Sequence, residues 1–187
     1  TRTKMALDAG ADLVLELPLY YAAGSAEYFA SGAVALLDKL GVVDTLCFGS
    51  ECGDIKTLTE IAILLSKEDE AFSNAIKSKM KQGLTYPRAR MQVIEETLPN
   101  SFMHVDAMSY PNNILGIEYI KAIIQRDSKI LPQTTRRMGA GYHDRMVTEV
   151  MSSALSIRES LKSADSLEMI QSSVPPHVYE MMKKDFH

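Results

Sequence analysis

The feature that most constrains the fold is an alternation of short apolar segments with longer amphipathic ones in the first third of the chain. Residues 12–17 read Asp-Leu-Val-Leu-Glu-Leu and stop at a proline, as expected of a short, largely buried strand. Residues 25–40 carry apolar side chains at helical spacing and end at a glycine. A second strand is predicted over residues 44–48, followed by a helix that Asp54 can cap. This order is typical of a parallel sheet with right-handed crossovers.

The rest of the chain is predicted to be mainly helical. Helices are expected over residues 71–82, from about Pro87, from Pro111, from Ser152 or Ser153 to about 161, and after the Pro-Pro pair at 175–176. A short strand is predicted at residues 128–131, followed by a glycine-containing loop at 136–142. The first ten residues are typical of the tail of a helix, so we expect the sequence to be a fragment.

Composition excludes several classes of protein. The chain is 46% apolar and 24% charged, the balance of an ordinary globular protein, and its apolar stretches are too short to span a membrane. Cys47 and Cys52 provide no disulfide framework, and the four histidines, at positions 104, 143, 177 and 187, include no close pair for a metal. There is no Walker loop, dinucleotide glycine fingerprint or Gly-x-Ser-x-Gly elbow. A cytoplasmic protein is expected.

The net charge of −4 hides an uneven distribution. Residues 1–70 hold 12 acidic and 5 basic side chains, whereas residues 71–94 hold basic ones alone. Residues 121–162 add 8 basic side chains against 4 acidic ones. Basic segments on an acidic chain favour a local contact with a polyanion, although a solvated lysine face explains them at least equally well. The candidates in the first basic segment are Lys77, Lys79, Lys81, Arg88 and Arg90.

Ligands of open parallel sheets bind at the carboxyl ends of strands and at helix N-termini. Residues 48–51, Phe-Gly-Ser-Glu, follow a predicted strand, and Gly49 would let a ligand approach the backbone closely. An ordinary strand-to-helix turn is an equally good interpretation. Asn112 and Asn113 lie in the first turn of the helix opened by Pro111, where an amide suits an adenine edge or a ribose hydroxyl. Alternatively, one of them merely caps the helix.

Two further places have residue types that bind anions. Arg136 and Arg137 precede the glycine-containing loop, and paired guanidinium groups suit phosphate or carboxylate. His143 in that loop could act as an acid or base, but polar surface is the commoner role of a lone loop histidine. In residues 152–158, two serines stand at a predicted helix start and Arg158 follows further along the helix. The two hydroxyls and the arginine could together bind an oxyanion. Alternatively, one serine simply caps the helix and Arg158 is exposed. Together these features predict nucleotide or phosphate handling.

Several segments at these positions resemble the bacterial tRNA(Met) cytidine acetate ligases. They include Gly-Ala-Asp-Leu-Val-Leu-Glu-Leu-Pro at residues 10–18, Ser-Ala-Glu-Tyr-Phe-Ala at 25–30, Phe-Gly-Ser-Glu at 48–51 and Pro-Asn-Asn-Ile-Leu-Gly at 111–116. The matches run in the family's order from residue 1 to about 160. Residues 152–158 also resemble the phosphate-binding signature of the wider HIGH-type nucleotidyltransferases, although Ser-Ser-Ala stands where the family more often has Ser-Ala-Thr.

The resemblance implies an α/β, Rossmann-like nucleotidyltransferase fold with a parallel sheet, truncated at its N-terminus. The core would occupy residues 1–162, with a helical insertion at about 68–105. Residues 163–187 would be a helical segment leading into a missing C-terminal region. The implied activity is an ATP-dependent ligase that activates acetate as acetyl-adenylate and acetylates N4 of the wobble cytidine of elongator tRNA(Met), with Mg²⁺ accompanying the ATP.

The resemblance also assigns residues to this reaction. The expected ATP contacts are Gly49, Asn112 and Arg137, with Asn113 and Arg136 as adjacent candidates. Three residues are expected to face the phosphates: Ser152, Ser153 and Arg158. The basic segments 77–90 and 121–162 are the expected tRNA contacts.

One departure from the family is the absence of its His-x-Gly-His turn, since no two histidines here are three residues apart. We expect that turn upstream of Thr1, so the sequence given should be inactive by itself. Two other interpretations stay open: an adenylyltransferase of the same superfamily that makes a cofactor without RNA, and a non-catalytic RNA-binding module.

Overall fold

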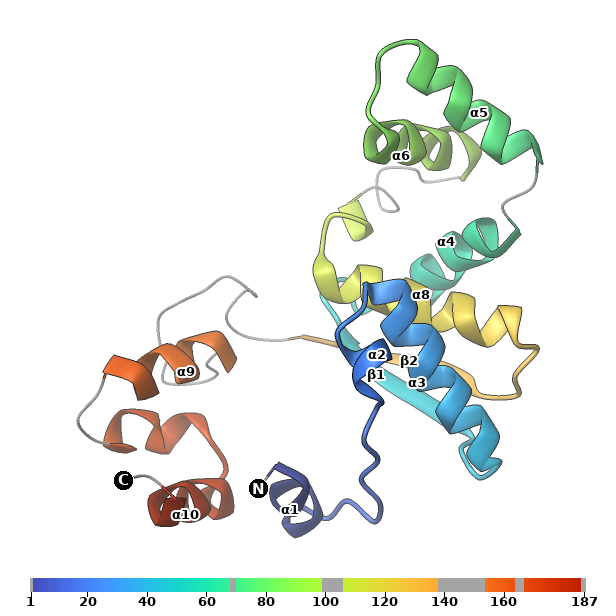
Figure 1. The fold of residues 1–187 in the computed structure, drawn as a ribbon. Coiled ribbons are helices and arrows are strands. Elements are labelled where there is room, and N and C mark those ends of the chain that lie inside the picture. Colours follow the sequence, from blue (N-terminus) through green and yellow to red (C-terminus); the bar gives the residue numbers. More distant parts are fainter. Residues whose placement is uncertain (1, 68–69, 99–105, 138–153, 164–166, 186–187) are drawn as a thin grey trace. The chain divides into compact units, whose positions relative to one another are not determined.

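The structure is a computed structural model that describes residues 2–67, 70–98, 106–137, 154–163 and 167–185 (Figure 1). By its internal contacts the chain divides into two compact units. The larger unit is Leu17–Arg137, and the smaller unit combines Thr1–Glu16 with Met138–His187.

Among the described residues of the larger unit, the sheet consists of two parallel strands, β1 (Thr45–Ser50) and β2 (Leu131–Arg136). Thr45 pairs with Leu131 at one end and Ser50 with Arg136 at the other, so both strands finish at the same edge. The long helical connection between them is what a parallel pair requires. The predicted α/β fold with a parallel sheet is confirmed.

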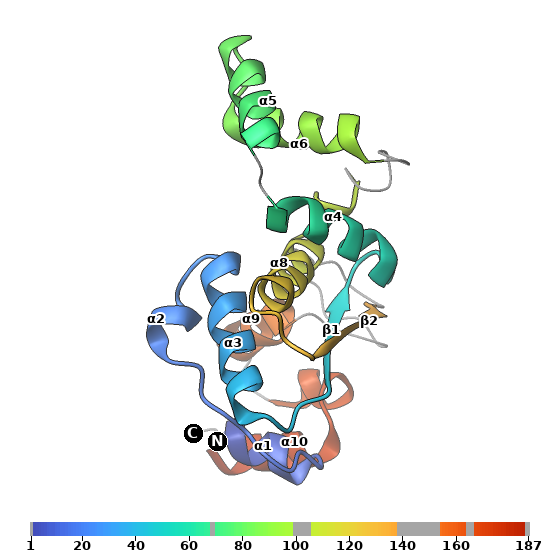
Figure 2. The same ribbon diagram turned by 90° about the vertical axis from the view of Figure 1, so that its right-hand side faces the viewer.

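Three helices pack around this pair of strands: α3 (Ala26–Leu40), α4 (Ile55–Lys67) and α8 (Pro111–Gln125). Helix α8 contacts both α3 and α4 and packs against β1 (Figure 2). A Cβ added at Gly116 would lie 2.4 Å from Cε2 of Phe48, so only glycine lets α8 approach β1 this closely. The side chains buried between α4 and α8 include Leu58, Ile61, Ile117 and Ile120.

Two shorter helices, α5 (Glu70–Lys81) and α6 (Tyr86–Thr97), pack against each other (Figure 1). Helix α5 ends before Gly83, and α6 carries its proline in the first turn, as predicted. Their buried side chains belong to the same apolar cluster as those of α4 and α8. The short helix α2 (Leu19–Ala22) contacts α3.

A buried lysine connects α3 to α8. Lys121 Nζ lies 2.7 Å from Glu118 Oε2 on its own helix and 3.0 Å from Glu27 Oε1 on α3. Burial by itself would lower the pKa of Lys121, but the hydrogen bonds to Glu118 and Glu27 raise it above its ordinary value. Lys121 therefore stays charged at neutral pH and holds the two helices together.

The described residues of the smaller unit are mainly helical. It contains α1 (Arg2–Asp8), α9 (Ala154–Ser163), the 3-10 segment η1 (Leu167–Ser173) and α10 (Pro176–Asp185). Its buried core is formed by Leu167, Ile170 and Tyr179. Among the residues that the structure describes, none of the helices in either unit combines the length and hydropathy that a membrane span requires.

Two predictions about strands are wrong. Residues 12–17 form neither strand nor helix, and Leu13 and Leu15 are 62% and 41% exposed. A strand depends on a hydrogen-bonded neighbour, and within the described ranges no segment pairs with this one. The strand predicted at 128–131 is misplaced, because residues 128–130 connect α8 to β2 and the strand itself runs from Leu131 to Arg136. There the Ile130 N–H donates a hydrogen bond to Ser128 Oγ at 3.3 Å.

Candidate functional site

The two strands end beside each other, and hydrogen bonds connect the residues at and near their ends. Ser50 is fully buried, and its Oγ lies 2.6 Å from Oγ1 of Thr134 on β2. The same Oγ accepts the Gly53 N–H at 3.0 Å. The Arg137 N–H donates to the carbonyl oxygen of Ser50 at 2.9 Å. The carboxyl edge of the sheet, where ligands of such folds bind, is therefore fixed by both strands.

Two glycines at this edge have arginine side chains lying against them. A Cβ added at Gly49 would lie 3.1 Å from Arg137 Cγ, and one added at Gly53 would lie 2.6 Å from Arg136 Cβ. Gly53 also has a φ of +65°, in the left-handed region that favours glycine. Both arginine residues are exposed, and paired guanidinium groups suit an anionic ligand.

Glu51 connects the end of β1 to the start of α8. Its Oε1 accepts hydrogen bonds from the Asn112 N–H at 3.2 Å and from Asn112 Nδ2 at 2.7 Å. Its Oε2 accepts the Asn113 N–H at 2.9 Å. The backbone N–H groups of Asn112 and Asn113 in the first turn of α8 are thus bound by a carboxylate 61 and 62 residues earlier in the chain.

Asn113 completes this connection from the opposite side. Its Oδ1 accepts the backbone N–H groups of Glu51 at 2.9 Å and Cys52 at 3.1 Å. These two bonds fix the orientation of the amide, because only its oxygen can accept them. Asn113 is fully buried, and within the described part of the chain its Nδ2 has no hydrogen-bond partner. The contacts of Asn113 therefore shape the loop after β1.

Helix α4 starts from the same loop and is capped by Asp54, as predicted. Asp54 Oδ1 accepts the Lys56 N–H at 3.0 Å, and Oδ2 accepts the Thr57 hydroxyl at 2.6 Å. The hydrogen bond from Thr57 is the main reason that the pKa of Asp54 lies below its ordinary value. Asp54 is thus a structural carboxylate at neutral pH.

The structure brings most of the sequence-predicted site residues to one edge of the sheet. The residues that lie there are Gly49, Asn112, Asn113, Arg136 and Arg137. Ser152, Ser153 and His143 lie outside the described residues. Arg158 is exposed on α9, in the smaller unit. Its expected contact with the phosphates remains a prediction.

Glu51 was missed as a site residue by reasoning from the sequence. One signal was available: α8 opens with Pro111, and the residue before it is Tyr110, which has no side chain suited to capping. In the structure Tyr110 makes no side-chain capping bond. A helix start without its own cap implies an acceptor from elsewhere, but a sequence does not say which acidic residue supplies it.

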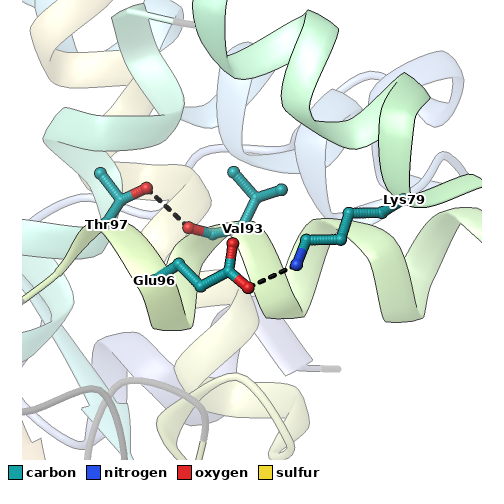
Figure 3. A network of polar contacts seen from close by, with 4 residues as sticks. All are labelled: Lys79, Val93, Glu96 and Thr97. Atoms are coloured by element: carbon teal, nitrogen blue, oxygen red, sulfur yellow. Dashed lines mark hydrogen bonds and ion pairs between the residues drawn. The ribbon is translucent and has the colours of Figure 1, made fainter.

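The five basic candidates of the α5–α6 segment differ in exposure. Lys77, Lys81 and Arg88 are exposed, whereas Arg90 is partly buried. Lys79 reaches from α5 to Glu96 on α6 and forms an ion pair (Figure 3). The same figure shows Thr97 of α6 donating to the carbonyl oxygen of Val93. Lys79 therefore contributes to holding the two helices together.

Comparisons with known proteins extend these observations. A tRNA(Met) cytidine acetate ligase of Acetivibrio thermocellus is 43% identical over 188 residues, which cover 99% of this chain and 45% of that protein. A ligase of the same name from Alkaliphilus metalliredigens is 41% identical over 199 residues, covering 100% of this chain and 46% of the relative. The chain thus spans less than half the length of these curated relatives.

Solved structures also resemble this chain over nearly its whole length. Thermotoga maritima TmcAL in its apo form matches with a TM-score of 0.90 and 32% identity, over 98% of this chain and 44% of that chain. The same protein bound with alpha-thio ATP matches with a TM-score of 0.85, over 98% of this chain and 43% of that chain.

A family model described as HIGH Nucleotidyl Transferase matches residues 1–187. The match covers the parallel strands, the glycine at the end of β1 and the helix start with its two asparagines. The chain therefore belongs to the HIGH nucleotidyltransferase family.

Proposed function

We propose that the protein carrying this chain is an ATP-dependent ligase that acetylates N4 of the wobble cytidine of elongator tRNA(Met). The observation that carries this proposal is the convergence of Gly49, Asn112 and Arg137 at the carboxyl ends of β1 and β2. The chain that bears this site aligns along 98% of its length with a structure bound to alpha-thio ATP. The names of its relatives support tRNA(Met) as the acceptor.

In the first step an oxygen of acetate attacks the α-phosphorus of ATP, the bond to the bridging oxygen breaks, and pyrophosphate leaves. Catalysis of this displacement depends on positioning and on donors around the developing charge. Gly49 has no side chain, which leaves room for Arg137 to lie against the end of β1, where the ATP is proposed to bind. Arg137, with Arg136 beside it, supplies positive charge, and Asn112 supplies an amide for the adenosine.

Contacts of Ser152, Ser153 and Arg158 with the phosphates are expected from the resemblance of residues 152–158 to the phosphate-binding signature alone. Mg²⁺ is expected to accompany the ATP phosphates. Within the described residues, no group of three His, Cys, Asp or Glu side chains could hold a metal ion.

In the second step the N4 amine of cytidine attacks the carbonyl carbon of acetyl-adenylate, AMP leaves, and N4 loses a proton. The exposed residues Lys77, Lys81 and Arg88 are the strongest candidates to contact the tRNA backbone, with Lys79 and Arg90 beside them. A tRNA substrate also supports a location in the cytoplasm.

The test is acetate-dependent exchange of pyrophosphate into ATP by the complete protein, first without and then with tRNA. We expect exchange that requires acetate and that falls about a hundredfold or more in Arg137→Ala, since one donor to a developing anion has an effect of that size. In the assay without tRNA the control is Arg126→Ala, because Arg126 lies at the opposite end of α8 and pairs with Asp38.

Each rival interpretation predicts a different result. Adenylate formation that ignores acetate would support a cofactor-making adenylyltransferase. Binding of tRNA without any response to ATP would support a non-catalytic RNA-binding module. Absence of acetate-dependent exchange with and without tRNA would contradict the proposed ligase.

A further inference from the structure

The start of α8 has no free backbone donor in its first turn. Pro111 opens the helix and carries no N–H, and the first helical hydrogen bond runs from the Ile114 N–H to the Tyr110 carbonyl oxygen at 3.0 Å. The two N–H groups between them belong to Asn112 and Asn113, and both donate to Glu51. A single carboxylate therefore satisfies the donors that a phosphate would otherwise use at this helix start.

Glu51 also places a negative charge at the positive end of α8. A carboxylate there interacts favourably with the helix dipole and repels a second anion. The opposite sign is found at the end of β2, where Arg136 and Arg137 are exposed. The edge of the sheet thus has a negative charge at the start of α8 and positive charges at the end of β2.

The side chain of Asn112 is held by the same carboxylate. Its Nδ2 donates to Glu51 Oε1 at 2.7 Å, and its backbone N–H donates to the same oxygen at 3.2 Å. Two bonds to one oxygen restrict both the backbone and the side chain of Asn112. The position of an amide that would contact adenosine is therefore set by Glu51.

We propose that Glu51 is a positioning residue that sets the direction in which a nucleotide binds. It fixes Asn112 for the base or ribose, and its charge keeps the phosphates away from the start of α8 and beside the arginines of β2. This inference rests on the proposed function insofar as the ligand is a nucleotide. It does not require that acetate be the group activated.

The test is a comparison of three probes, ATP, adenosine and inorganic tripolyphosphate, binding to the complete protein by calorimetry. In Glu51→Gln one oxygen is retained, but the other becomes a donor that faces an N–H group. We expect adenosine to bind about tenfold to a hundredfold more weakly, the range for losing a charged hydrogen bond. Tripolyphosphate should bind about tenfold more tightly, because a repelling charge is gone.

A purely structural role would weaken all three probes together, so opposite shifts for adenosine and tripolyphosphate are the informative result. The matched control is Glu95→Gln, which removes one exposed carboxylate on α6 and should leave all three affinities unchanged. Glu51→Asp retains the charge but shortens the side chain. It should bind adenosine more weakly while still rejecting tripolyphosphate.

The inference is overturned if Glu51→Gln leaves adenosine binding unchanged or weakens tripolyphosphate binding. If Glu51→Gln does not fold, the test depends on Glu51→Asp. Tighter binding of tripolyphosphate by Glu51→Asp would then overturn the inference. Opposite shifts in a protein without acetate-dependent exchange would support the inference while contradicting the proposed ligase. A wild-type protein that binds neither ATP nor adenosine would contradict both.

Discussion

Replacing Asn113 with alanine should destabilise the protein more than any other single truncation at the site. Asn113 is fully buried, and its Oδ1 is the acceptor for the backbone N–H groups of Glu51 and Cys52, at 2.9 and 3.1 Å. Alanine leaves both donors without that acceptor. The loop after β1 would then no longer be held against the start of α8 by this side chain.

The size of the effect follows from these hydrogen bonds. A buried donor left without a partner costs about 1–3 kcal/mol, and these two hydrogen bonds are part-buried, so water that reaches the donors reduces that cost. Part of this cost is offset, because alanine also removes Nδ2, which has no hydrogen-bond partner among the described residues. The net loss in the free energy of unfolding should be about 2–4 kcal/mol.

The assay is urea unfolding of wild-type protein, Asn113→Ala and Asn112→Ala, with deuterium exchange over residues 48–54 to locate the change. Asn112 is the matched control, since it is the adjacent asparagine but only partly buried and donates one side-chain bond, to Glu51. Its removal should cost about 1–2 kcal/mol. Deuterium exchange over residues 48–54 should accelerate much more in Asn113→Ala than in Asn112→Ala.

Asn113→Asp separates geometry from charge. The aspartate keeps an acceptor for both N–H groups but buries a second negative charge beside Glu51, so it should be at least as destabilising as alanine. A loss below about 1 kcal/mol in Asn113→Ala, with unchanged exchange over residues 48–54, would refute the reasoning.

Three further predictions concern the rest of the larger unit. Replacing a glycine inside a helix with alanine normally stabilises the helix. Gly116→Ala should instead lower the free energy of unfolding by about 1–3 kcal/mol, measured by thermal unfolding, because the new Cβ meets the Phe48 ring. Asp54 has a pKa below its ordinary value, so its contribution to stability is present above about pH 4 and is lost as the pH falls further. The destabilisation by Asp54→Asn, measured by unfolding at pH 7 and pH 3, should therefore shrink at the lower pH. Alanine at the exposed basic positions Lys77, Lys81 and Arg88 should weaken tRNA binding. The slope of log K against log salt concentration should fall by about one for each phosphate that is no longer neutralised. By contrast, Lys79→Ala should mainly lower stability, because Lys79 pairs with Glu96.

Helices were predictable from the sequence because their signals are local. Helix α3 ends at Gly41, whose φ of +68° lies in the left-handed region, and α4 begins after its own aspartate cap. Pro111 similarly marks the start of α8. Each signal lies within a few residues of the boundary that it sets.

Strands and the details of the site were less predictable because they depend on distant partners. The segment 12–17 has the composition of a strand, yet it is not one in the structure, since composition does not supply a neighbour. Conversely, the strand β2 contains Pro132, Gln133 and two threonines, and its pattern is too polar to stand out. The bonds of Glu51 span 61 and 62 residues, and no local pattern indicates them.

Because Glu51 binds the N–H groups at the start of α8, anion-binding residues alone do not determine how a nucleotide lies in this site. ATP has a neutral base at one end and a polyanion at the other, and adenylation requires the α-phosphorus at a single position. An edge that offered free N–H groups at α8 and guanidinium groups at β2 could bind the phosphates in either direction. A carboxylate at α8 makes one direction unfavourable, and specificity commonly requires such a repulsive element. Glu51 thus gives the site its direction, while Asn113 holds the loop after β1 on which Glu51 lies.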